Sequence, residues 1–92
     1  MNFEWNPRKA ESNLRKHRVS FVEAATVFGD DLAITVPDPD HSIDEERCIT
    51  IGWSNRRRLL MVAHADRGNR IRIISARELT RREQKAYEEE NN

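Results

Sequence analysis

The sequence predicts an α+β fold in which two helices precede an antiparallel sheet of four to five strands, and one further helix closes the chain. Capping boxes at residues 20–23 and 80–83 each mark a helix start. Four segments with strand patterns lie together between residues 32 and 77, after the leading helices rather than alternating with them. Strands grouped in this way favour an antiparallel sheet. With 92 residues the chain is expected to form a single domain, residues 1–92, around one modest core.

The first part of the chain predicts one short strand and two helices. Residues 2–5 alternate polar and apolar side chains, which indicates a strand. Asn6 can cap a helix over residues 7–17, whose first residue is a proline that needs no hydrogen bond at that position. The capping box at residues 20–23 starts a second helix, and Gly29 ends it.

The rest of the chain predicts four strands and a final helix. Apolar residues alternate over 32–36 before two prolines, and again over 47–53. Residues 59–65 are apolar at nearly every position, which predicts a central strand covered on both faces. A turn at Gly68 leads to a last strand over 70–77, and the second capping box then opens a helix that extends through Tyr87.

The charges are unevenly distributed although sixteen basic residues balance sixteen acidic ones. Residues 56–82 contain nine arginines against only Asp66 and Glu78. Residues 30–46 contain seven acidic residues and neither lysine nor arginine. One part of the molecule is therefore expected to bind phosphate groups and another to repel them.

Cysteine usage and hydropathy point to a cytoplasmic protein. Cys48 is the only cysteine, so an internal disulfide and a multi-cysteine zinc site are both excluded. We interpret it as a small buried hydrophobe. The N-terminus lacks the pattern of a signal peptide, and nowhere do eighteen apolar residues occur together, so no membrane association is expected.

The strongest candidates for phosphate contacts are Arg67, Arg72 and Arg77, with Arg70 nearby. Guanidinium groups match phosphate oxygens two at a time, and they are costly to bury unpaired. Strand alternation places Arg70 and Arg72 on one face and Arg77 on the other, unless a bulge shifts the register. The alternative is that these are solvated arginines at a sheet edge, where they deter aggregation.

Four further residues are candidates for proton transfer or RNA contact. His64 and Asp66 are two residues apart on one strand, so their side chains share a face, and an imidazole beside a carboxylate can transfer protons. The alternative is a core histidine satisfied by that carboxylate. Lys16 and His17 can extend a phosphate-binding track, or can merely complement the dipole of the first helix.

The acidic segment is a weak candidate for a divalent cation site. It contains Asp38-Pro39-Asp40-His41, Glu45 and Glu46, but the spacing is not that of an EF-hand. A solvated loop or a docking surface for a basic partner explains it better, and we expect no cofactor.

If the protein cleaves nucleic-acid strands without a metal, RNA is the expected substrate, because the 2′-OH of RNA can itself attack the adjacent phosphate. A noncatalytic nucleic-acid-binding module and a partner-docking module remain alternatives.

The chain resembles the BrnT family of toxins from bacterial type II toxin–antitoxin modules over nearly all of its length. The matching residues are Phe3, Trp5, Pro7, Lys9, Ala10, Asn13, Lys16, His17, Val19, Ser20 and Phe21, then Asp40-His41-Ser42, Glu46-Arg47 and Ile51-Gly52, and finally Ile71 to Arg77 with Thr80, Glu83 and Tyr87. It departs from the family pattern at Asn6, where an acidic residue is usual. It departs again at Arg18, where glycine is usual, and this affects the turn between the first two helices.

The resemblance implies a RelE-like fold and a ribonuclease that inhibits translation. It also implies a cognate BrnA-type antitoxin, and contact with operator DNA only through the antitoxin complex. Arg67, Arg72, Arg77 and His64 look like matching positions, and the roles given to them are our inference. We therefore expect a metal-independent endoribonuclease with catalytic His64, Asp66, Arg67, Arg72 and Arg77, and with Lys16, His17 and Arg70 as RNA-binding residues.

Overall fold

The computed structural model describes residues 1–39 and 46–90. Its elements follow the predicted order: β1 (Asn2–Glu4), α1 (Pro7–His17), α2 (Phe21–Thr26) continued by the 3-10 turn η1 (Val27–Gly29), β2 (Ile34–Pro37), β3 (Arg47–Trp53), β4 (Leu59–Arg67), β5 (Arg70–Glu78) and α3 (Arg81–Glu90). The predicted α+β class is thereby confirmed. Among the described residues no helix has the length and apolar character needed to cross a membrane.

The helix starts form as their caps predict. The Asn6 side-chain oxygen accepts hydrogen bonds from the backbone N–H groups of Arg8 and Lys9, at 2.8 and 3.2 Å. The Ser20 hydroxyl accepts the Glu23 N–H at 3.0 Å. Such caps satisfy backbone donors that have no partner inside the helix, so residues within three positions of each other suffice to fix a helix start.

The five strands form one mixed sheet in the order β1-β5-β4-β3-β2. All neighbours are antiparallel except β1, which pairs with β5 in parallel over Asn2–Glu4 and Arg70–Arg72. The expectation of a purely antiparallel sheet is therefore wrong at this edge. Two helices separate β1 from the other strands, so the chain can return in either direction, and three residues carry no signal for the choice.

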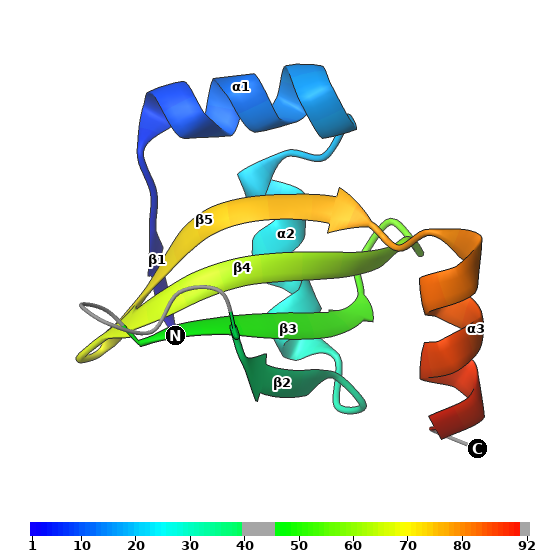
Figure 1. The fold of residues 1–92 in the computed structure, drawn as a ribbon. Coiled ribbons are helices and arrows are strands. Elements are labelled where there is room, and N and C mark those ends of the chain that lie inside the picture. The colour runs from blue at the N-terminus through cyan, green and yellow to red at the C-terminus, as the bar shows by residue number, and fades with distance from the viewer. Residues whose placement is uncertain (40–45, 91–92) are drawn as a thin grey trace.

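α2 and η1 cover one face of the sheet and form the core with it, as Figure 1 shows. The core residues from this covering layer are Val19, Phe21, Ala24 and Val27, and those from the sheet are Leu60, Val62, Ile73 and Ala76. We call the opposite face of the sheet the outer face; strand register places Ile49, Met61, Ala63, Arg72, Ser75 and Arg77 there. The prediction that the central strand is covered on both faces is only half right, because Met61 and Ala63 stay half-exposed.

α1 lies along β5 and closes the edge of that strand beyond β1 (Figure 1). The buried Asn13 amide donates to the carbonyls of Val19 and Ala76, at 2.9 and 2.8 Å, and accepts the Ala76 N–H at 3.1 Å. An open strand edge exposes unpaired backbone groups, so this side chain substitutes for a missing strand. It also sets the position of the α1 C-terminus relative to the sheet.

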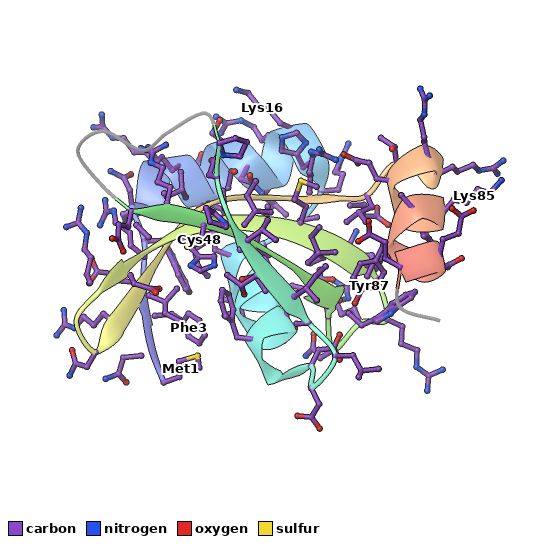
Figure 2. All side chains as sticks on the ribbon, turned by 60° about the horizontal axis from the view of Figure 1, so that its bottom comes forward. Met1, Phe3, Lys16, Cys48, Lys85 and Tyr87 are labelled. Carbon is purple, nitrogen blue, oxygen red and sulfur yellow. The ribbon has the colours of Figure 1, made fainter. Side chains whose placement is uncertain are left out.

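α3 packs across the end of the outer face. Tyr87 lies between α3 and the sheet (Figure 2), and its hydroxyl donates to the Leu32 carbonyl at 3.2 Å. A groove beside it is lined by Ile34, Ile51 and Met61 of the sheet. α1 and α3 thus border the outer face on two sides.

Candidate functional site

A β-bulge brings the arginines of β5 to the outer face. The pairing of β4 with β5 shifts between Ala63 and His64, which leaves one extra residue, Ile74, on β5. An extra residue reverses the alternation of side chains beyond it. Arg77 therefore lies on the same face as Arg72, which the sequence analysis expected only if a bulge shifts the register.

A cavity of about 290 Å³ opens on the outer face, and we call it the outer cavity. Its apolar lining residues are Ile49, Met61, Ala63 and Ala76. Its polar lining comes from Ser75 and Arg77 of β5, from His17 at the end of α1, and from Asp38 after β2. The cavity therefore combines an imidazole, a guanidinium, a hydroxyl and a carboxylate, contributed by distant parts of the chain.

Arg77 is held by Glu83 of α3. Its Nη1 and Nη2 donate to the two carboxylate oxygens at 2.7 and 3.0 Å, and Nη1 also donates to the Glu78 carbonyl at 3.2 Å. The hydrogen bonds from Arg77 lower the pKa of Glu83 to about 2, and the same contact raises the pKa of Arg77. The guanidinium is fixed at the cavity, but an anion there must compete with Glu83 for its terminal nitrogens.

The other arginines lie toward the opposite end of β5. Arg72 donates to the Glu4 carboxylate at 3.1 Å, and Arg70 lies 3.7 Å from the same group. Arg67 pairs with Arg70 across the hairpin turn. Arg72 and Arg77 are five positions apart, about 16 Å in a fully extended strand and somewhat less across the bulge. The structure thus aligns these arginines along one face and does not gather them around a single phosphate.

His64 is on the covered face, away from the arginines. It is buried, its Nε2 lies 2.7 Å from the Thr50 hydroxyl, and Phe28 packs edge-on at a ring-centroid distance of 4.9 Å. Its Nδ1 is 3.6 Å from the exposed Asp66 carboxylate, and burial lowers its pKa despite that carboxylate. The structure therefore does not bring His64 to the arginines as expected, and its burial favours the neutral form of the ring.

Of the two histidines that the structure describes, His17 is the one that borders the outer cavity. It is exposed at the last residue of α1, next to Lys16, whose side chain projects at the periphery of the molecule in Figure 2. The sequence-based expectation gave proton transfer to His64, whereas His17 is the imidazole that shares a cavity with Arg77. One signal pointed to His17: it is four residues after Asn13, so both face the sheet if Asn13 is buried there.

Part of the arginine excess serves the fold. Arg58 donates through Nε to the buried Glu23 carboxylate at 2.9 Å and also bonds the second oxygen of that group. Ser54 donates to Glu23 at 2.7 Å. The contact with Arg58 lowers the pKa of Glu23, so this pair remains ionised and ties α2 to the start of β4. Fewer arginines are thus available for phosphate contacts than the arginine count indicates.

The candidate metal and cysteine sites gain no support in the described part of the chain. No three His, Cys, Asp or Glu side chains gather there, while Asp40, His41 and Glu45 of the weak acidic candidate lie outside the described residues. Cys48 is half-buried, and burial followed by the charge of Asp66 raises the pKa of its thiol. Since the thiolate is the nucleophile, a raised pKa fits the hydrophobic interpretation of Cys48.

Comparison with known proteins identifies what this architecture is similar to. A family model described as the ribonuclease toxin, BrnT, of type II toxin–antitoxin systems matches residues 5–83. The crystal structure of the Brucella abortus ribonuclease toxin BrnT shares the fold with a TM-score of 0.69 and 21% sequence identity, over 88% of this chain and 99% of that chain. No curated protein sequence matches this chain.

Proposed function

Because this chain belongs to the BrnT family of ribonuclease toxins of type II toxin–antitoxin systems, we propose that it is a metal-independent endoribonuclease with a RelE-like fold. It acts in the cytoplasm and inhibits translation by cleaving RNA. The observation that carries the proposal is the outer cavity, where His17 and Arg77 border one space of about 290 Å³. An imidazole and a guanidinium at one site can move protons and stabilise negative charge without a metal.

The proposed reaction uses the 2′-OH of RNA as nucleophile. The 2′-oxygen forms a bond to phosphorus while the bond from phosphorus to the 5′-oxygen breaks, leaving a 2′,3′-cyclic phosphate and a 5′-hydroxyl. His17 takes the proton from the 2′-OH, and a solvent molecule or a second acid protonates the leaving oxygen. A positioned base contributes about 10²–10⁴-fold to the rate.

Arg77 supplies the positive charge for the phosphorane-like transition state in this proposal. Removing one preorganised donor from such a site typically costs about 10²–10³-fold. Glu83 orients Arg77, so it acts as a positioning residue. Arg67, Arg70 and Arg72 contact phosphates farther along the strand, and Lys16 contacts one beside His17.

A BrnA-type antitoxin is the proposed partner. Membership in a type II toxin–antitoxin family supports a protein antitoxin that binds the toxin directly. In this proposal it covers the outer face and excludes RNA, and operator DNA is bound only by the complex. Co-expression of the adjacent small reading frame should restore growth, and purification should then recover a complex of the two chains.

The direct test is incubation of the purified protein with RNA in excess EDTA. We expect cleavage, with fragments that end in a 2′,3′-cyclic phosphate. RNA that stays intact at all protein concentrations would contradict the enzymatic proposal. Fragments with a 3′-hydroxyl would contradict attack by the 2′-OH.

A second candidate is a noncatalytic RNA-binding module. One observation favours it: Glu83 already occupies both terminal nitrogens of Arg77, which leaves the cavity with little free positive charge. A salt-dependent shift in RNA mobility without cleavage would select this candidate. A stable protein complex with no RNA affinity would select partner docking instead.

A further inference from the structure

A second concave surface lies between α1 and β5, beside the outer cavity. It encloses about 190 Å³, and we call it the α1/β5 groove. Its lining residues are Lys9, Ser12, Asn13, Lys16, His17, Ile74 and Ser75. His17 and Ser75 also line the outer cavity, so the two hollows are adjacent at this pair of residues. One extended chain can therefore contact both.

The groove contains positive charge that the fold does not use. Lys9 and Lys16 line it and are exposed, and neither forms an ion pair with any residue that the structure describes. By contrast, Arg72 and Arg77 are paired with Glu4 and Glu83. None of the groove's lining residues is acidic. Unpaired ammonium groups attract counterions, whose release on binding favours a polyanion.

The spacing of the two lysines matches an extended ligand. They are seven residues apart, which is about two helical turns, so they lie on the same side of α1 with about 10 Å between them along the helix axis. The Ser12 hydroxyl lies between them and can donate a hydrogen bond. One phosphate cannot span that distance, so the two lysines contact different groups of a chain.

We propose that the α1/β5 groove binds the sugar–phosphate backbone of single-stranded RNA next to the nucleotide held in the outer cavity. Lys16 contacts the phosphate nearer His17, and Lys9 contacts one farther along α1. This inference rests on the proposed function, and it adds a defined second subsite with Lys9 and Ser12 as new contacts. Because the groove offers charge and hydroxyl groups, its contribution to affinity is independent of base sequence.

The test measures binding of a short 2′-O-methyl RNA, which lacks the attacking hydroxyl and so cannot be cleaved by the proposed reaction. Fluorescence anisotropy gives the affinity of the wild-type chain and of the double variant Lys9→Ala, Lys16→Ala at several salt concentrations. The matched control is Arg8→Ala, Arg15→Ala, which removes two charges with the same spacing, about 100° around α1 from the lysines. Circular dichroism verifies that all three proteins fold.

The plot of the logarithm of the RNA association constant against the logarithm of the salt concentration should be less steep for the lysine variant, by about 1.4. Each contact with a phosphate of single-stranded RNA contributes about 0.7 to this slope. The wild-type affinity should then fall about 7-fold more than that of the variant between about 50 and 200 mM salt. The arginine control should keep the wild-type slope.

Two outcomes would overturn the proposal that this groove binds RNA. One is a slope in the lysine variant equal to that of the wild type. The other is an equal reduction of the slope in the arginine control, which would indicate only general electrostatic attraction. The proposed function fails separately. If the wild-type chain binds the modified RNA but leaves ordinary RNA intact, cleavage is refuted, while the slope comparison still decides whether the α1/β5 groove binds RNA.

Discussion

Arg77 and Glu83 form a two-point ion pair, with Nη1–Oε1 at 2.7 Å and Nη2–Oε2 at 3.0 Å. Arg77 ends the outer-face run of β5, and Glu83 is in the first turn of α3, where its carboxylate also accepts the Thr80 N–H at 2.9 Å. One carboxylate therefore caps the last helix and orients the guanidinium at the cavity. Fold and candidate site depend on the same contact.

The pH dependence of stability should include this ion pair. Glu83 has a folded-state pKa of about 2 against an ordinary value of 4.5, so its contribution is fully present above about pH 4.5 and is lost as the pH falls toward 2. Both side chains are more than a third exposed, so solvent screening limits the effect to about 1 kcal/mol. Urea unfolding at several pH values should show this loss in the wild type and not in Glu83→Gln. An identical pH profile in both proteins would contradict it.

The outer cavity should be sensitive to its two functional side chains. Arg77→Ala and His17→Ala should each lower kcat/KM for RNA cleavage by about 100-fold or more, because they remove a charge stabiliser and a proton acceptor. Lys85→Ala on α3 removes a distant exposed charge (Figure 2) and should change the rate little. Full activity in a folded Arg77→Ala, His17→Ala double variant would indicate that the active site lies outside the outer cavity.

Replacement of His64 should affect stability and leave cleavage intact. Burial depresses its pKa below the ordinary 6.5, so the neutral ring stabilises the fold above about pH 6.5, and this contribution is lost as the pH falls through the depressed value. His64→Leu removes the titrating imidazole, so the free energy of unfolding should depend less on pH below neutrality. Its cleavage rate should stay within about 3-fold of wild type, well below the loss expected for a catalytic base. A folded His64→Leu protein as inactive as His17→Ala would return proton transfer to His64.

Arg18 should be a site where glycine stabilises the protein. It ends α1 with φ of 59° and ψ of 29°, and its N–H donates to the Leu14 carbonyl at 3.0 Å. Left-handed backbone costs an L-residue about 1–2 kcal/mol, and glycine adopts it freely. Arg18→Gly should therefore raise the free energy of unfolding by about 1 kcal/mol, which thermal denaturation detects as a rise of about 4–8 °C.

The matched control for Arg18 is Arg15→Gly, three residues earlier. Arg15 lies inside α1, where glycine costs about 1 kcal/mol of helix stability. Its melting temperature should fall. If the melting temperatures of both variants change in the same direction, the left-handed conformation at Arg18 is not what limits stability there.

Helix starts and strand patterns were predictable because their signals are local. Asn6, Ser20 and Thr80 each bond to backbone groups two or three residues away, so a short window of sequence contains both partners. The BrnT resemblance likewise depended on residues read in order along the chain, and the family match over residues 5–83 confirms it. Arg77 and His17, which both line the outer cavity, were also among the candidates that the sequence offered.

The assembly of those residues was decided by the tertiary structure. The bulge at Ile74 puts Arg77 on the same face as Arg72, and the pairing register puts His64 on the opposite face. Glu4 and Glu83, unnoticed as partners, neutralise arginines that seemed free in the sequence. Strand register and ion pairs depend on residues brought together from distant positions, and a one-residue shift moves a side chain to the other face. The amino-acid order thus determined the elements and the family, while packing between them determined which imidazole and which guanidinium share a cavity.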